Sequence, residues 1–200
     1  MIEIEKKFFL TRDDKARLIK GAEFLGKKMF ADTYYDSSDY TLTTRDMWLR
    51  SRDNTFHLKV SARKTEKRQI GEYHELETEE EIRKELGMPS GKDLKKDLTD
   101  KGYIPFASFI TTRRKYKRGE FTIDLDMTDF GYEIGEIELL VRSEDERDGA
   151  IEKIFSFARS IGLPIVPVNG KVIQYIYKNN LPHYKALIQA GVLSGKGTRE

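Results

Sequence analysis

The sequence of 200 residues carries 36 lysines and arginines against 34 aspartates and glutamates, a net charge of +2, and it has no cysteine. The near balance of charge does not indicate a nucleic-acid partner, the lack of cysteine excludes disulfides and thiolate metal sites, and no apolar run approaches the roughly 18 residues that a membrane-spanning helix needs. From the length and from the start of the chain, which does not resemble a signal peptide, we expect one cytoplasmic, monomeric domain over residues 1–192, a frayed tail at 193–200 and no membrane partner.

From the N-terminus onward, short segments alternate apolar and charged residues, the pattern of strands with one face in a core. The predicted strands span residues 2–8, 30–36, 47–52, 56–60, 72–77, 107–116, 121–126 and 135–139. Apolar residues at helical spacing, N-capping residues and closing glycines predict helices between and after them. The predicted helices span residues 13–22, 78–86, 93–101, 143–161, 171–177 and 182–190. The basic stretch from residue 61 to residue 71 is predicted to be an open loop.

The first predicted strand has one charged and one apolar face. In an extended chain Glu3, Glu5 and Lys7 share one face, and apolar residues occupy the other. The same pattern returns at Glu136 and Glu138. We expect these two strands to contribute to one site.

Other strands also carry rows of charge on one face. The rows hold Arg50 and Arg52 beside Trp48, Lys59, Arg113 with Lys115, and Asp124 with Asp126. Like charges two residues apart on one face are unfavourable unless a counter-charge lies between them. A closed barrel brings such rows together, removes the sheet edges and leaves the apolar outer face for helices. We therefore predict an α+β fold, an eight-stranded antiparallel closed β-barrel (a tunnel) with a charged lumen and flanking helices.

A lumen with rows of carboxylates and rows of lysine and arginine suits a divalent cation bound to a polyphosphate. Carboxylates are hard ligands for Mg²⁺, or Mn²⁺, and arginine and lysine match phosphate oxygens. The alternative is that these charges pair with one another, although buried ion pairs cost desolvation and are a poor reason to build a charged interior. The histidines, His57, His74 and His183, are scattered and do not indicate a zinc site.

Specific motifs accompany this pattern. Residues 3–7, Glu-Ile-Glu-Lys-Lys, match a Glu-x-Glu-x-Lys signature, and the segments that follow in order are 48–52, 58–59, 75–76, Arg113, 124–126, 135–138 and Lys171. Through these residues the chain resembles the CYTH superfamily, the triphosphate tunnel metalloenzymes, over about residues 1–190. Within this superfamily it is most similar to the soluble thiamine triphosphatases of animals, through residues 32–36, 48–50, 72–76, 109–113 and 129–132.

The resemblance implies roles for the matching residues. The residues implied to hold a triphosphate are Lys7, Arg50, Arg52, Lys59, Arg113 and Lys171, and Trp48 would stack on the thiazolium ring. The residues implied to bind one or two Mg²⁺ ions are Glu3, Glu5, Asp124, Glu136 and Glu138, with Glu75 supporting them. The implied reaction is metal-dependent hydrolysis of the terminal phosphoanhydride of thiamine triphosphate.

Three residues are candidates for the chemical step: Lys59, Tyr34 and Glu138. Glu138, or a second metal, would orient the attacking water. Tyr34 and Lys59 would act together as general acid and base if the lysine lowers the pKa of the tyrosine, with Tyr73 as an equal competitor.

Other functions fit the same lumen. An inorganic triphosphatase or a class IV adenylyl cyclase would keep every phosphate and metal residue but has no need for Trp48, which would then be a core or barrel-rim aromatic. A non-catalytic polyphosphate-binding module would not need the carboxylates. The basic residues between 63 and 68 lack interleaved aromatics, which favours a solvated loop over RNA contact.

Overall fold

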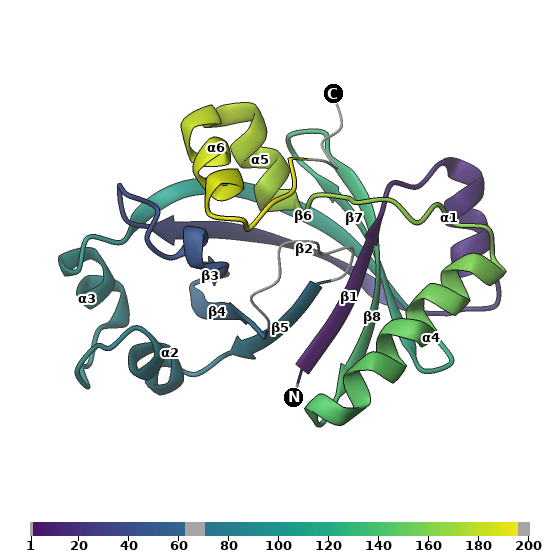
Figure 1. Ribbon diagram of the computed structural model, residues 1–200, viewed down its shortest axis with the longest axis horizontal. Coiled ribbons are helices and arrows are strands. Elements are labelled where there is room, and N and C mark those ends of the chain that lie inside the picture. Colours follow the sequence, from purple (N-terminus) through teal and green to yellow (C-terminus); the bar gives the residue numbers. More distant parts are fainter. Residues whose placement is uncertain (1, 63–70, 196–200) are drawn as a thin grey trace.

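A computed structural model describes residues 2–62 and 71–195, and in these residues eight strands join edge to edge into a closed ring (Figure 1). The strands are β1 (Ile2–Phe8), β2 (Glu23–Asp36), β3 (Met47–Arg52), β4 (Thr55–Ser61), β5 (Gly71–Leu76), β6 (Ile104–Arg118), β7 (Phe121–Thr128) and β8 (Glu133–Val141). Their order around the ring is β1-β5-β4-β3-β2-β6-β7-β8, and all neighbours are antiparallel. The predicted eight-stranded closed barrel is confirmed.

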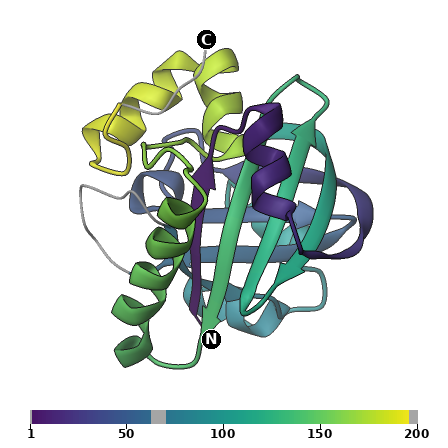
Figure 2. The same ribbon diagram turned by 90° about the vertical axis from the view of Figure 1, so that its right-hand side faces the viewer.

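Helices flank the ring. They are α1 (Arg12–Ile19), α2 (Glu79–Glu85), α3 (Leu94–Asp100), α4 (Arg147–Ser160), α5 (Lys171–Asn179) and α6 (Leu181–Gln189). Figure 2 shows α4 running along the outer side of β1 and β8. Helices α2 and α3 lie at the opposite end of the molecule, and α5 and α6 form a pair above the ring in Figure 1.

The apolar outer face of the ring is the main reason for this arrangement. Ile4 of β1 and Ile137 of β8 are fully buried against Ile154 of α4, while Leu58 of β4 packs against Ile82 of α2. Burying one such side chain stabilises the fold by about 1.5–3 kcal/mol. Strand alternation therefore directs the charged residues to the interior of the ring, as predicted.

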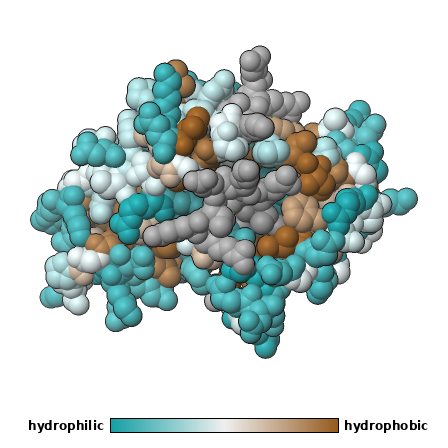
Figure 3. Space-filling view, in the orientation of Figure 1, coloured by the Kyte–Doolittle hydropathy of each residue, from teal (hydrophilic) through white to brown (hydrophobic). Residues whose placement is uncertain are grey.

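Hydrophilic side chains dominate the periphery of the face in Figure 3, and hydrophobic residues show as smaller patches among them. None of the helices in residues 2–62 and 71–195 is long and apolar enough to cross a membrane.

Several element boundaries differ from the prediction. Strand β2 begins at Glu23, because its first residues pair with β6 although apolar and charged residues do not alternate there. The register of this pairing shifts next to Gly26, whose φ of 144° is one that glycine tolerates. Helix α1 ends at Ile19, just before a turn at Gly21 with φ of 72°. Helix α4 begins only at Arg147. Most of the predicted open loop, residues 63–70, and residues 196–200 of the predicted tail lie outside the described residues.

The α5–α6 pair attaches to the ring through apolar contacts beside the cavity inside the ring. Val172 and Ile176 of α5 pack in one cluster with Tyr34 of β2, Trp48 of β3 and Phe109 of β6. This contact fixes the start of α5, where Lys171 lies, relative to three strands of the ring.

A buried hydrogen-bond chain reinforces this attachment from α6. His183 Nε2 lies 2.7 Å from Thr43 Oγ1, which donates to Asp36 Oδ2 at 2.6 Å. Since the threonine hydroxyl gives its hydrogen to the carboxylate, His183 Nε2 must be the donor to the hydroxyl. The imidazole is fully buried and stacks on the Tyr40 ring at 3.9 Å between centroids. Burial lowers the pKa of His183 to about 4.

This histidine makes stability depend on pH. The pKa of His183 is about 6.5 in the unfolded chain and about 4 in the folded protein. The neutral imidazole therefore contributes its full stabilisation above about pH 6.5, and this contribution is lost as the pH falls toward 4. Between pH 7.5 and 5, we expect the free energy of unfolding to drop by about 2 kcal/mol more in the unaltered protein than in His183→Gln. Urea denaturation measures both. The exposed His74→Gln is the control, and an equal drop in all three proteins would contradict the assignment.

Candidate active site

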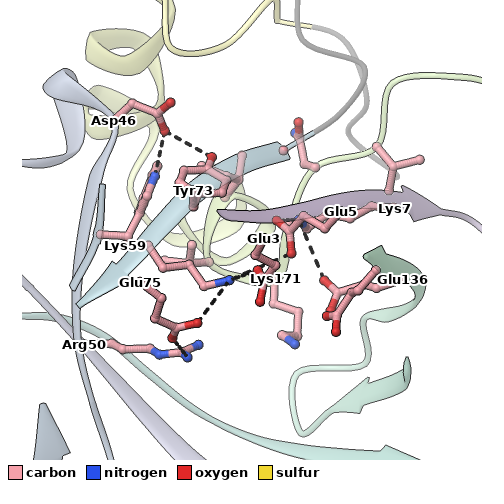
Figure 4. Close-up of a pocket in the computed structure, with 18 of the residues that line it drawn as sticks. Glu3, Glu5, Lys7, Asp46, Arg50, Lys59, Tyr73, Glu75, Glu136 and Lys171 are labelled. Carbon is pink, nitrogen blue, oxygen red and sulfur yellow. Dashed lines mark hydrogen bonds and ion pairs between the residues drawn. The ribbon is translucent and has the colours of Figure 1, made fainter. Parts of the chain in front are cut away.

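The interior of the ring encloses a cavity of about 310 Å³, within the range of small-molecule sites (Figure 4). Its charged lining comes from β1, β3, β4, β5, β6 and β8, together with Asp46 just before β3 and Lys171 at the start of α5. The lysines and arginines of this lining are Lys7, Arg50, Arg52, Lys59, Arg113, Lys115 and Lys171. All six residues predicted to hold phosphate are therefore brought together around one cavity.

Three carboxylates meet on the wall formed by β1 and β8. Strand β1 pairs with β8 so that Glu5 lies opposite Glu138 and Lys7 lies opposite Glu136. One carboxylate oxygen each from Glu5, Glu136 and Glu138 lie within 4.8 Å of one another. The two strands that share the same charge pattern in the sequence are thus direct neighbours, and three of the five predicted metal ligands converge.

The electrostatics of these carboxylates fit a cation. Burial, together with the nearby Asp124 and Glu136, raises the pKa of Glu138 to about 8. Lys115 Nζ lies 3.9 Å from Glu138, too far for a hydrogen bond. For Glu5 and Glu136 burial alone would raise the pKa, but the lysines around them, Lys7 for both, hold it below the ordinary value. Among these three carboxylates Glu138 is therefore the one whose negative charge the nearby cations do not offset, and carboxylate oxygens are the ligands that Mg²⁺ and Mn²⁺ prefer.

The other two predicted ligands lie outside this group of three. Glu3 Oε1 contacts Lys59 Nζ, and burial raises the pKa of Glu3. Asp124 is fully buried in ion pairs with Arg113 and Lys115. In this arrangement both carboxylates neutralise and orient cations.

The arginines of the lumen are held by carboxylates. Arg52 binds Asp32 through two hydrogen bonds, from Nε at 2.7 Å and from Nη2 at 3.0 Å. Arg113 binds Asp126 in the same way, at 2.7 Å and 2.6 Å. Two-point pairing fixes the plane of a guanidinium group, so the remaining donors point in a set direction. The alternative that the charges pair with one another therefore holds for part of the lumen. The same pairs orient Arg52 and Arg113 for binding an anion.

The remaining cations are also close to carboxylates. Arg50 donates to Glu75 at 2.7 Å, which places the predicted supporting residue beside a phosphate-binding candidate. Lys59 Nζ lies 3.9 Å from both Glu5 and Glu75. Burial alone would lower the pKa of Lys59, but the carboxylates of Glu5 and Glu3 outweigh it and raise the pKa above the ordinary value. Lys59 is therefore a fixed positive charge.

Aromatic side chains occupy one end of the cavity. Trp48 of β3 and Tyr73 of β5 line it, and both donate to Asp46: the indole Nε1 at 2.8 Å and the phenol oxygen at 3.2 Å (Figure 4). Trp48 is 7% exposed, and it packs against Ile173 and other apolar residues of the cluster that joins α5 to the ring. The indole is thus both a packed aromatic and part of the cavity wall.

A family model for the CYTH domain matches residues 1–166. The chain belongs to the CYTH family. The thiamine-triphosphatase of Homo sapiens is 32% identical over 94% of this chain and 90% of that protein, and that of Macaca fascicularis is 31% identical over the same shares.

Solved structures show the same fold. A protein from Pyrococcus horikoshii OT3 superposes with a TM-score of 0.57 at 24% identity over 81% of this chain and 91% of that chain. A protein from Hippeastrum, described as an adenylyl cyclase candidate with a dominant triphosphatase activity, superposes with a TM-score of 0.56 at 18% identity over 91% of this chain and 98% of that chain. At these identities the likeness concerns the CYTH fold alone.

Tyr34 does not have the environment that an acid–base pair with Lys59 would need. Burial and the nearby Asp32 raise the pKa of Tyr34, whereas the hypothesis required a lowered one. Arg50 lies opposite Tyr34 on the neighbouring strand, and its positive charge only partly offsets this rise in pKa. The phenol therefore keeps its proton at neutral pH.

Sequence analysis missed several residues of this CYTH lumen. Asp126 binds Arg113 and Lys171, and Asp32 binds Arg52, although neither was a candidate ligand. Asp126 could have been found from its place two residues after Asp124 on the same strand face. Asp32 could not, because only the pairing of β2 with β3 places it opposite Arg52. His57 also comes close to Glu75 and Glu77 through the β4–β5 pairing, beside the positive charge of Arg50.

Removing a carboxylate should have opposite effects at two places. Asp126→Asn leaves Arg113 and Lys171 buried beside an uncharged partner, so we expect a loss of about 3–5 kcal/mol in the free energy of unfolding. Glu138→Gln removes the surplus charge. At pH 8.5 with EDTA we expect it to stabilise the protein by on the order of 2 kcal/mol.

Urea denaturation at that pH measures both effects. Glu133→Gln, an exposed residue of the same strand β8, is the control and should change stability by less than about 0.5 kcal/mol. A destabilised Glu138→Gln protein in EDTA would contradict the surplus of negative charge.

Proposed function

We propose that the protein hydrolyses the terminal phosphoanhydride of thiamine triphosphate and releases thiamine diphosphate and phosphate. The observation that carries this proposal is the convergence of three carboxylates, two of them buried and one half-buried, with seven lysines and arginines and one tryptophan on a single cavity. The identity of 31–32% with thiamine-triphosphatases over 94% of the chain supports the same substrate.

Glu5, Glu136 and Glu138 would hold the metal ion, with Glu3 and Asp124 beside them as further candidate ligands. Three carboxylate oxygens within 4.8 Å of one another suit Mg²⁺ or Mn²⁺, which keep several waters and share phosphate oxygens with the protein. When bound, the ion supplies charge neutralisation at the phosphoryl group and at the leaving diphosphate. It would also bring the pKa of Glu138 down, because it adds the counter-charge that this carboxylate lacks.

Lysines and arginines around the cavity would bind the triphosphate. Lys7, Lys59 and Lys171 are point charges, and Arg50, Arg52 and Arg113 are oriented by carboxylates before substrate arrives. Pre-oriented donors in a buried site stabilise developing negative charge without reorganising during the reaction. This set would hold the terminal phosphoryl group against the carboxylate wall.

Glu138 would orient the attacking water and accept its proton. The water oxygen forms a new bond to the terminal phosphorus while the bond from that phosphorus to the bridging oxygen breaks, and the electron pair leaves with thiamine diphosphate. A diphosphate ester is a weak base, so it needs charge neutralisation more than a strong acid. Lys59, whose pKa is raised, fits this charge role better than proton transfer.

Tyr34 would act as a hydrogen-bond donor to the substrate. Tyr34 lines the cavity opposite Arg50 on the neighbouring strand, and its hydroxyl hydrogen can point toward a phosphate oxygen there. Trp48, at the end of the cavity, would place its indole face under the cationic thiazolium ring, a contact worth about 0.5–2 kcal/mol.

The function is tested by phosphate release from thiamine triphosphate, inorganic triphosphate and ATP, with Mg²⁺ and with EDTA. We expect thiamine triphosphate to be preferred and EDTA to abolish turnover. Trp48→Ala should lower kcat/KM for thiamine triphosphate about tenfold or more and change it less than about threefold for inorganic triphosphate. Trp48→Phe keeps an aromatic face and should lie between. If inorganic triphosphate is preferred and Trp48→Ala changes nothing, the substrate is inorganic triphosphate.

The role of Tyr34 is tested by Tyr34→Phe, which keeps the ring and removes the hydroxyl. We expect kcat for thiamine triphosphate to fall about tenfold, because one donor to the phosphates is lost, while the pH profile keeps its shape since the phenol does not titrate near neutrality. Tyr73→Phe is the matched comparison. Turnover equal to that of the unaltered protein in Tyr34→Phe would remove Tyr34 from the mechanism.

A further inference from the structure

Asp46 occupies a fixed position where the chain enters β3. Its backbone is in the left-handed region, with φ of 57°, directly after the short turn Thr43–Arg45. Its N–H donates to Thr43 O at 3.0 Å, and its carbonyl accepts from the N–H of Ser61 at 3.2 Å. Because the backbone is held from both sides, the direction of the side chain is set before any ligand binds.

The carboxylate of Asp46 ties together two aromatic residues of the cavity wall. A single oxygen, Oδ1, accepts from Trp48 Nε1 and from the Tyr73 hydroxyl (Figure 4). Trp48 and Tyr73 lie on β3 and β5, which are separated in the ring by β4. The carboxylate therefore bridges over one strand and fixes the orientation of the indole plane relative to the cavity.

Asp46 also comes just before the strand that carries two of the phosphate-binding residues, Arg50 and Arg52. Side chains on one face of a strand recur every two residues, about 7 Å apart, so Trp48 and Arg50 are successive residues on one face of β3. Asp46 lies two residues before Trp48 in the sequence. Asp46 lines the same cavity, and so do the apolar residues Val192 and Leu193. A triphosphate held at Arg50 would direct its organic group toward a tryptophan face, an apolar wall and a carboxylate.

We propose that Asp46 is the specificity-determining residue for the organic end of the substrate: it orients Trp48 and Tyr73, and its negative charge favours a cationic aromatic group such as thiazolium over neutral or absent organic groups. This inference rests on the proposed hydrolysis of thiamine triphosphate. Asp46 acts through the aromatic residues and through its charge, and it takes no part in bond breaking.

Two substitutions separate these contributions. Asp46→Asn keeps an oxygen that accepts both hydrogen bonds but removes the charge, and asparagine tolerates a positive φ. Asp46→Gly removes both hydrogen bonds and the charge, and glycine adopts a φ of 57° without strain. Asp53→Asn is the matched control, because Asp53 has φ of 48° in the β3–β4 turn and does not line this cavity.

Steady-state kinetics with thiamine triphosphate and inorganic triphosphate measure specificity. For thiamine triphosphate we expect KM to rise about threefold in Asp46→Asn and about tenfold or more in Asp46→Gly. For inorganic triphosphate kcat and KM should stay within about twofold, and Asp53→Asn should match the unaltered protein. Equal losses on both substrates would overturn the inference, because they would show a merely structural role.

Trp48 provides an independent readout, since it is the sole tryptophan of the sequence. In EDTA, without turnover, Asp46→Gly should shift the emission maximum and lower the anisotropy of Trp48, whereas Asp46→Asn should keep both. Unchanged emission and anisotropy in Asp46→Gly would overturn the positioning role. If the unaltered protein does not prefer thiamine triphosphate, the proposed function fails and charge selection by Asp46 fails with it. If that preference exists but survives in Asp46→Gly, only the present inference fails.

Discussion

Strand β1 lies antiparallel to β8 in a register that sets Glu5 against Glu138 and Lys7 against Glu136. Buried carboxylates this close repel one another, and each costs several kcal/mol to desolvate. The ring can close at this seam only because lysines reach in from β1 and β4 and an arginine reaches in from β6. The charged rows on the remaining strands are therefore a requirement of this one pairing as well as a means of binding phosphate.

The same constraint explains why the lumen is not neutral at every point. Asp32 with Arg52 and Asp126 with Arg113 are complete pairs with two hydrogen bonds each, so they contribute a rigid frame. Glu138 has no comparable partner among the described residues, and burial together with the nearby carboxylates raises its pKa. A lumen made only of complete pairs would be more stable, but it would have no reason to bind a cation. A carboxyl group that can lose its proton only at a cost gives up stability for ligand binding.

Much of the fold and of the lumen followed from the sequence because strand alternation is local. Glu3 and Glu5, or Arg50 and Arg52, share a face whatever the rest of the chain does. The pairing of β1 with β8 joins residues more than 120 positions apart, so alternation could not show which carboxylates meet, and Glu3 and Asp124 fell outside the group of three. The first half of β2 and the bridge from Asp46 to Tyr73 were missed for the same reason, since each depends on a partner strand.

Strand β1 also links the two sides of the barrel wall. On the inside Lys7 faces Glu5 and Glu136, and on the outside its neighbour Lys6 is buried and donates to Val166 O at 2.6 Å. That contact holds the segment between Val166 and Gly170. A Cβ atom at Gly170 would approach Lys7 Cε to 3.2 Å, so this position needs glycine. The next residue, Lys171, forms an ion pair with Asp126. The last cation of the lumen is thus positioned by a lysine outside it. Adjacent residues of one strand therefore determine both the carboxylate wall and the charge that faces it.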